Sequence, residues 1–344
     1  MDEQIIRSTD NDALSCRYSL TLNTYITDPY LPHILTGFQK FLKYETTAPR
    51  RALGALTKPK LPVINRGSFI RIRSIDIIIK RFIDQFKESS KDGIRILNLG
   101  AGSDTRAFDI LTLNKEKVEV IEVDFPDSVK FKKATILDNQ FLSNVIGYPF
   151  DNEAHRSDEK FYHGLDHTEL KTERYRLVPM DLRETDKLKS FLSELSVKPT
   201  LIISECMLCY LNTLESEALL TTLHENIKQG VLAIYDPLGG EGGFGHVMID
   251  NLRLRNLPLT TLLEFNTLKK YHTRLQSIGF NKVEIDHMYN ILNHWLPQDE
   301  IRRISRIEFL DEIEELKLLL EHYCLSLSTW GITFDHGLRF NDSV

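Results

Sequence analysis

Short apolar segments alternate with longer segments of mixed polarity along most of the chain. The apolar segments that have the length and composition of buried strands fall at residues 94–99, 118–123, 176–182, 200–210, 231–236, 283–289 and 322–330. Several connecting segments carry apolar residues at helical spacing. Strands that alternate with helices are typical of a parallel sheet covered on both faces. The pattern therefore predicts a doubly wound α/β fold with a mostly parallel, seven-stranded, Rossmann-like sheet.

Helical segments also occur outside this alternation. Residues 1–60 indicate helices separated by prolines, and residues 68–88 indicate a long helix with Ile75 and Phe82 on its apolar face. Residues 307–320 predict an acidic amphipathic helix. A helical layer at the N-terminus is therefore expected to precede the first strand.

The domain organisation follows from these segments. The length of 344 residues suits one large α/β domain, and we expect a single domain over residues 1–344. Residues 1–90 would form an N-terminal helical cap. Residues 139–174, which are polar, and residues 239–275, which begin with a glycine-rich stretch, are expected to be insertions that form a lid over the site.

A glycine turn follows the first expected strand. The chain reads Asn98-Leu-Gly-Ala-Gly102, and Asp124 ends the next apolar run, twenty-four residues beyond Gly100. Glycine lets a backbone approach a ligand closely, and an acid at the next strand end can accept hydrogen bonds from a ribose diol. The third glycine of a dinucleotide fingerprint is replaced by Thr105, which favours S-adenosylmethionine over a pyrophosphate cofactor.

Two further expected strands end in acidic residues. Asp181 with Leu182 fits an adenine site, and Glu205 could accept from the ammonium group of a cofactor. Each acid could instead cap the following helix or lie in solvent. In doubly wound sheets, however, ligands bind beyond the carboxyl ends of the strands, and acids in register on consecutive strands favour the functional interpretation.

Composition narrows the class of protein. The chain is 42% hydrophobic and 27% charged, with a net charge of −6, so we expect no nucleic acid partner. The N-terminus lacks a signal-peptide core and no apolar run reaches membrane-spanning length, so we expect a cytoplasmic protein without a membrane partner. Cys206 and Cys209 are predicted on opposite faces of a strand without a second ligand pair, so no metal is expected.

At this point the chain resembles the leucine carboxyl methyltransferase family, whose members methyl-esterify the C-terminal leucine of the protein phosphatase 2A catalytic subunit. The resemblance is closest to fungal members and spans nearly the full length. The segments that carry it are Asn65-Arg-Gly-Ser-Phe-Ile-Arg71, Asn98–Arg106, Val123-Asp-Phe-Pro126, Asp181-Leu-Arg183, Ile203-Ser-Glu-Cys-Met-Leu-Cys-Tyr210, Phe309–Leu316, His322-Tyr-Cys324 and the run 235–240.

The resemblance implies the sheet of a class I S-adenosylmethionine-dependent methyltransferase, and it implies the cofactor itself. The residues expected to contact the cofactor are Arg17, Arg71, Gly100, Asp124, Asp181, Leu182 and Glu205. Arg17 stands where the family has a lysine, so charge is kept while the geometry changes. The implied partner is the phosphatase 2A catalytic subunit, engaged through its tail and its active-site face, by a monomeric enzyme.

The implied reaction needs no general base. A peptide α-carboxylate has a pKa near 3.3–3.7 and is ionised at pH 7, so it can attack the sulfonium methyl group directly. The enzyme must align the reactants and exclude water. We expect Arg71, Tyr210 and Tyr235 to be the catalytic residues that orient the carboxylate, although either tyrosine could be packed core with a hydrogen-bonded tip.

Three alternatives remain open from the sequence. The first is a nicotinamide-dependent oxidoreductase, which the missing third glycine disfavours. The second is a phosphatase-binding scaffold with a relic cofactor site. The third is a carboxyl methyltransferase of the tRNA wybutosine pathway, a related class that carries a long C-terminal repeat propeller, whereas this chain ends at residue 344 without one.

Overall fold

The computed structural model describes residues 3–151, 158–240, 242–257 and 259–338. The chain divides into two compact units. The first, here called the glycine-turn unit, comprises Arg7–Pro59 and Arg95–Asp181. The second, here called the C-terminal unit, comprises Met1–Ile6, Lys60–Ile94 and Leu182–Val344.

The glycine-turn unit contains a parallel strand core with short helices. Its strands are β1 (Ile94–Leu99), β2 (Val118–Asp124), β3 (Leu170–Lys171) and β4 (Tyr175–Pro179). Their order is β3-β4-β2-β1; β2 pairs parallel with β4, and β3 pairs antiparallel with β4. All six residues of β1 are buried, which is typical of a strand covered on both faces.

The helices of this unit precede and connect the strands. They are α1 (Glu3–Leu22, whose residues 7–22 belong here), α2 (Leu31–Phe41), the 3₁₀ turn η1 (Leu42–Tyr44), α3 (Pro49–Leu56), α5 (Arg106–Leu113), α6 (Pro126–Leu137), α7 (Gln140–Ile146) and α8 (Asp158–Gly164). The expected series of helices separated by prolines in residues 1–60 is confirmed.

The C-terminal unit contains four longer strands. They are β5 (Thr200–Glu205), β6 (Gly230–Pro237), β7 (Lys282–His287) and β8 (Tyr323–Trp330), in the order β5-β6-β8-β7. Strands β5 and β6 are parallel, whereas β8 runs antiparallel to both of its neighbours. Every residue of β6 is buried, so this strand lies at the centre of the core of the unit.

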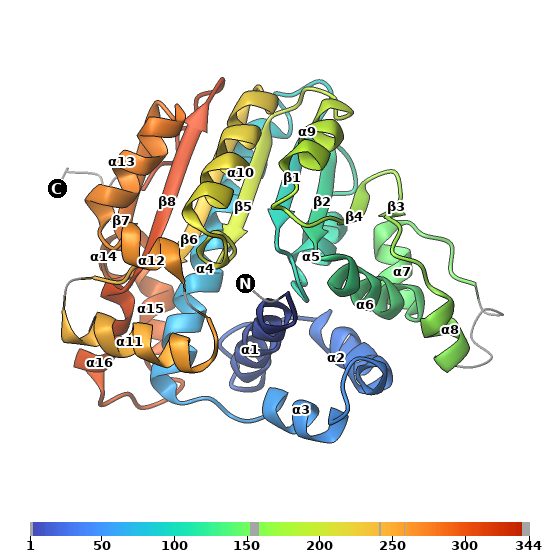
Figure 1. The fold of residues 1–344 in the computed structure, drawn as a ribbon, viewed down its shortest axis with the longest axis horizontal. Helices are drawn as coiled ribbons and strands as arrows, with labels where there is room; N and C mark the ends of the chain where they lie inside the picture. The colour runs from blue at the N-terminus through green and yellow to red at the C-terminus, as the bar shows by residue number, and fades with distance from the viewer. Residues whose placement is uncertain (1–2, 152–157, 241, 258, 339–344) are drawn as a thin grey trace. The chain divides into compact units, whose positions relative to one another are not determined.

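Helices cover both sides of these four strands. Helices α10 (Thr213–Asn226) and α13 (Leu268–Ile278) lie in front of the strands in Figure 1, and α4 (Pro62–Phe86) runs behind them. The capping box that Asn212 forms with Glu215 fixes the start of α10. The remaining helical segments are α9 (Thr185–Ser193), η2 (Leu208–Tyr210), α11 (Gly243–Leu254), α12 (Thr260–Glu264), α14 (Met288–Asn290), the π-helical η3 (Ile291–Trp295), α15 (Gln298–Ile304) and α16 (Ile313–Glu321).

The α/β fold class with a mostly parallel sheet is confirmed. Seven strands were expected, and the described residues contain eight, because the two-residue β3 had no apolar run to reveal it. Each of the seven expected strands is found; β1 has the expected bounds, and the other six have shifted ends. Within the described residues, no helix combines the length and the hydropathy needed to span a bilayer.

Two expected boundaries are wrong for physical reasons. The strand expected over residues 200–210 ends at Glu205, because Cys206 has φ +52° and leaves the extended region. The helix expected over residues 307–320 begins only at Ile313. The Glu308 carbonyl, which would accept a helical N–H, instead accepts a 3.0 Å hydrogen bond from the Arg66 guanidinium of α4.

Candidate functional site

The glycine turn joins the ends of β1 and β2 within the glycine-turn unit. The Gly100 N–H donates to the Val123 carbonyl at 2.8 Å, and the Ala101 N–H reaches the same carbonyl at 3.3 Å. Gly100 has φ +67° and Gly102 has φ +44°, in the left-handed region that L side chains rarely adopt. The turn therefore requires glycine at both positions, as expected of a backbone shaped for close approach.

Asp124 faces this turn, as the sequence indicated. Its Oδ2 accepts the Gly102 N–H at 2.6 Å, and its Oδ1 accepts the N–H of Phe125 at 2.7 Å. The N-cap position of α6 is Phe125 and receives no side-chain cap, so Asp124 is not a simple helix cap. Burial raises the pKa of Asp124 above its usual value, although both backbone hydrogen bonds oppose this shift.

A second carboxylate, which sequence reasoning missed, also reaches the turn. Asp10 of α1 accepts hydrogen bonds through Oδ1 from the Ser103 backbone N–H at 2.9 Å and from the Ser103 hydroxyl at 2.8 Å. Arg7, Asp10 and Arg17 recur at spacings of three and seven residues, which places charged groups on one face of α1. That spacing was the available signal, but it could not show which loop the helix faces.

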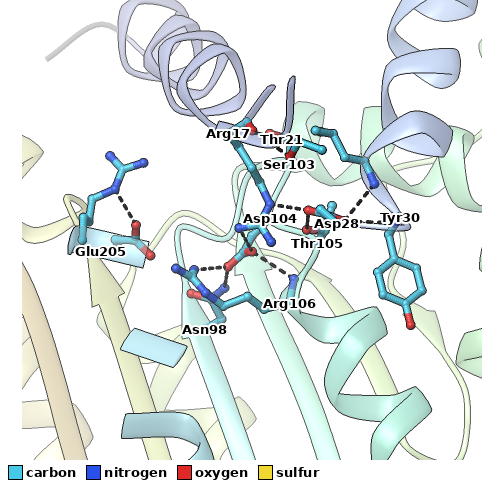
Figure 2. Close-up of polar contacts among 12 residues, drawn as sticks. Arg17, Thr21, Asp28, Tyr30, Asn98, Ser103, Asp104, Thr105, Arg106 and Glu205 are labelled. Atoms are coloured by element: carbon cyan, nitrogen blue, oxygen red, sulfur yellow. Dashed lines mark hydrogen bonds and ion pairs between the residues drawn. The ribbon is translucent and has the colours of Figure 1, made fainter. Parts of the chain in front are cut away.

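Arg17 is engaged by carboxylates of its own unit. Its Nε lies 2.5 Å from Oδ2 of Asp28, and its Nη1 lies 3.9 Å from Oδ1 of Asp104. The Thr105 hydroxyl donates to the same Asp28 oxygen at 2.6 Å, as Figure 2 shows. Arg17 therefore lies over the residues that follow the glycine turn, in a buried network of opposite charges.

Asp104 anchors the other end of that network. Its Oδ2 accepts hydrogen bonds from the Arg106 guanidinium at 2.7 Å and from the Asn98 amide at 3.2 Å (Figure 2). Burial alone would raise the pKa of Asp104, but the charges of Arg106 and Arg17 outweigh burial and hold it well below its usual range. Asp104 is therefore ionised at neutral pH and fixes both arginines.

In the C-terminal unit, Arg71 of α4 pairs with Glu205 at the end of β5. The Arg71 Nε lies 2.9 Å from Oε1 of Glu205, and the side chains are 18% and 17% exposed. Arg71 is therefore largely buried and paired, and it is not a solvent-exposed cation on the helix surface. The pair combines a cation and an anion that match the carboxylate and ammonium groups of an amino acid.

The two tyrosines singled out by the sequence occupy different surroundings. Tyr235 is a buried residue of β6 whose ring stacks on Tyr323 of β8, with centroids 5.3 Å apart. Burial raises the pKa of Tyr235 well above its usual value, so its hydroxyl stays protonated at neutral pH. Tyr210 ends η2 and packs on a small apolar cluster that includes Cys209 and Leu262.

The remaining candidates lie near their expected strand ends. Asp181 follows β4 by two residues and is partly buried, and Leu182 is 6% exposed.

The thiols of Cys206 and Cys209 do not lie on a strand, contrary to expectation, and burial raises the pKa of each. Protonated thiols are poor nucleophiles and poor metal ligands. Among the residues that the structure describes, no three His, Cys, Asp or Glu side chains are placed to hold a metal ion.

These features define a protein of the α/β class with a glycine turn at the carboxyl end of its first strand. The model of the leucine carboxyl methyltransferase family matches residues 5–224. Leucine carboxyl methyltransferase 1 of Candida albicans is 37% identical over 94% of this chain and 91% of its own length. The proteins of the same name from Debaryomyces hansenii and Rattus norvegicus are 35% and 30% identical, over 94% and 96% of this chain and 92% and 91% of their own lengths.

The chain therefore belongs to the leucine carboxyl methyltransferase family and is a methyltransferase. Among solved structures, an O-methyltransferase family protein from Burkholderia thailandensis is similar, with 12% identity and a TM-score of 0.44 over 93% of this chain and 72% of that one. A similarity this distant adds nothing to the assignment.

Proposed function

We propose that this protein transfers a methyl group from S-adenosylmethionine to the α-carboxylate of the C-terminal leucine of the protein phosphatase 2A catalytic subunit. The observation that carries the proposal is the family match over residues 5–224, which contains the glycine turn, Asp124 and the Arg71–Glu205 pair. Curated relatives that match over more than nine-tenths of this chain bear the name leucine carboxyl methyltransferase 1.

The residues present suit the proposed cofactor. Gly102 has the left-handed backbone of a glycine turn, and the partly buried Asp124 carboxylate beside it can accept ribose hydroxyls. Arg71 and Glu205 offer opposite charges for an amino-acid group. We propose that these residues hold S-adenosylmethionine together with Arg17, Gly100, Asp181 and Leu182.

The proposed methyl transfer requires the side chains mainly to position the reactants. When bound, S-adenosylmethionine supplies a methyl group on a cationic sulfur, which keeps the electron pair of the broken carbon–sulfur bond. The acceptor carboxylate is ionised at neutral pH, so no residue has to remove a proton. The protein contributes by orienting the reactants and excluding water, which can lower the activation free energy by several kcal/mol, up to about 7–11 kcal/mol in well-oriented cases.

We propose that Arg71, Tyr210 and Tyr235 orient the acceptor carboxylate. The guanidinium of Arg71 is held in place by Glu205 at 2.9 Å, so its fork is fixed before a substrate arrives. The raised pKa of Tyr235 keeps its O–H available as a hydrogen-bond donor at neutral pH. A neutral donor can orient a carboxylate without binding it so strongly that it loses its reactivity.

Methyl-label transfer tests the proposal. The protein should move a labelled methyl group from S-adenosylmethionine onto intact phosphatase 2A catalytic subunit, and the product should release the label as methanol in mild base, as an ester does. A catalytic subunit that lacks its last leucine is the matched control and should accept no label. Equal labelling of both substrates would contradict leucine esterification.

The same preparation separates the remaining alternatives. An oxidoreductase would bind reduced nicotinamide in a fluorescence titration, and a binding scaffold would hold the phosphatase without any methyl transfer by the parent protein.

We further propose that the enzyme acts as a cytoplasmic monomer that contacts the active-site face of the phosphatase as well as its tail. Light scattering of the complex would show whether one copy of each chain is present.

A further inference from the structure

The space that Gly102 leaves open is filled by the chain itself. A Cβ built on Gly102 would lie 2.3 Å from Oδ1 of Asp10, far inside van der Waals contact. A glycine at such a turn ordinarily lets a ligand approach the backbone. Here the carboxylate of Asp10, from a helix more than ninety residues earlier in the sequence, occupies that approach.

The hydrogen-bond donors of the turn are also engaged within the unit. The N–H groups of Gly100 and Ala101 donate to Val123, and that of Gly102 donates to Asp124. The next N–H, of Ser103, donates to Asp10, as does the Ser103 hydroxyl. A ligand that accepts from the N–H of Gly102 or Ser103 must therefore displace a carboxylate of the protein.

Charged contacts on both sides of Asp10 hold the same helix. One turn earlier, Arg7 binds Asp127 and Glu45, each at 2.9 Å. Two turns later, Arg17 binds Asp28 at 2.5 Å. These side chains share one face of α1, so residues 7–22 of the helix cover the glycine turn as one piece.

We propose that residues 7–22 of α1 form a lid that Asp10 latches onto the glycine turn, and that the ligand of this turn must displace Asp10 to bind. The identity of that ligand, S-adenosylmethionine, rests on the proposed function. The latch itself rests on the contacts of Asp10 with Gly102 and Ser103.

The electrostatic surroundings make the latch dependent on pH. Burial raises the pKa of Asp10 to about 6, the neighbouring carboxylate of Asp124 at the end of β2 adds to the shift, and the hydrogen bonds from Ser103 and the charge of Lys132 on α6 oppose it. On the same helix, Arg7 lies near enough to Asp124 to act on its pKa. A raised pKa means that the latched state favours the protonated acid, so the latch weakens as pH rises through about 6.

Calorimetry with two variants tests the lid. Asp10→Ala should bind S-adenosylmethionine about five times more tightly than the parent, because no latch has to open before binding. Asp12→Ala, which removes an exposed carboxylate from the same helix, is the matched control and should leave the affinity unchanged within about twofold. Weaker or unchanged binding by Asp10→Ala would overturn the proposal, since weaker binding would make Asp10 a ligand of the cofactor.

A second measurement does not depend on the cofactor. In the absence of ligand, hydrogen exchange at the Ser103 amide should be at least about threefold faster in Asp10→Ala than in the parent. Equal exchange rates would show that Asp10 does not latch the turn. If the parent fails to bind S-adenosylmethionine at all, the proposed function fails, and the exchange comparison still decides the latch.

The asparagine variant carries the test if alanine disrupts the fold. Asp10→Asn keeps an oxygen that can accept from Ser103 but cannot titrate near pH 6. The parent should bind more tightly as pH rises from 5 to 7.5, and Asp10→Asn should lose at least half of that change in the logarithm of the dissociation constant. An undiminished pH dependence in Asp10→Asn would assign it to Asp124 and contradict the role of Asp10.

Discussion

The guanidinium of Arg71 lies 2.9 Å from the carboxylate of Glu205, and each side chain is less than one-fifth exposed. The two residues are 134 positions apart in the sequence and come from α4 and the end of β5. Both charges are largely removed from water, so removing one of them leaves the other unpaired, which lowers the stability of the folded state. The pair therefore links the stability of the C-terminal unit to the residues proposed to carry its chemistry.

Arg71→Ala should abolish measurable methyl transfer and lower the free energy of unfolding by about 1–3 kcal/mol, because Glu205 is left without its cation. Urea unfolding and methyl-label transfer check the two effects. Arg73→Ala is the matched control, since Arg73 lies on the same helix and binds Glu300. It should show a similar loss of stability with transfer retained, and equal loss of transfer in both variants would remove the special role of Arg71.

Asp124→Asn should weaken binding of S-adenosylmethionine about tenfold or more, because a neutral amide accepts hydrogen bonds less strongly than a carboxylate. The pKa of Asp124 is raised, so ionised Asp124 costs the folded state stability above that pKa. The amide, however, has one oxygen for the two backbone N–H groups that Asp124 accepts, so the two effects oppose each other and the variant should stay within about 2 kcal/mol of the parent at pH 7.5. Calorimetry and thermal unfolding check this pair of expectations, and a large loss of stability would make Asp124 a structural residue instead.

Tyr235→Phe should lower the rate of methyl transfer about tenfold or more while leaving cofactor affinity within about twofold, because it removes one hydrogen bond to a charged acceptor. The stacked contact with Tyr323, with ring centroids 5.3 Å apart, should persist because both aromatic rings are kept. Rates at saturating cofactor provide the measurement. An unchanged rate would return Tyr235 to a packing role.

Asp236 should make the folding stability depend on pH. The acid is buried in β6, the Tyr271 hydroxyl donates to its Oδ2 at 2.8 Å, and burial raises its pKa from 3.8 to about 7. A raised pKa stabilises the protonated folded state, so this contribution is lost as pH rises toward 7. Between pH 5 and pH 8 we expect the free energy of unfolding to fall by about 2–3 kcal/mol more in the parent than in Asp236→Asn.

Urea unfolding at the two pH values measures that difference. Tyr271→Phe serves as a second variant, because it removes the donor to Asp236 and should raise the pKa of the acid further. Parallel pH profiles for the parent and Asp236→Asn would show that the acid is not titrating in this range.

The sequence predicted the parts of the fold that depend on local pattern. Strands such as β1 and β6 are buried along their whole length, so an uninterrupted apolar run marks them. The glycine turn and Asp124 were predicted for a similar reason, since a backbone constraint and a strand end leave a local signature. The two-residue β3 has no such signature and was missed.

Features that depend on distant contacts could not be predicted in the same way. Helix α16 begins later than its apolar pattern indicated, and the carbonyl of Glu308 in the preceding segment accepts a hydrogen bond from Arg66, which lies in a distant part of the sequence. Asp10 reaches Ser103 across 93 residues, and nothing in the N-terminal sequence names that loop as its target. Arg17 was expected to contact the cofactor, and the structure shows in addition its ion pair with Asp28, an acid that the sequence did not single out.

The four successive amides of the glycine turn, from Gly100 to Ser103, each have an acceptor inside the protein. The newly synthesised protein can therefore fold this turn in the absence of the methyl donor, because each of these four N–H groups already has an acceptor. Donor binding would then add to stability in proportion to its concentration, without being a condition for folding. When the methyl donor is scarce, the protein would therefore stay folded and lose only its catalytic activity.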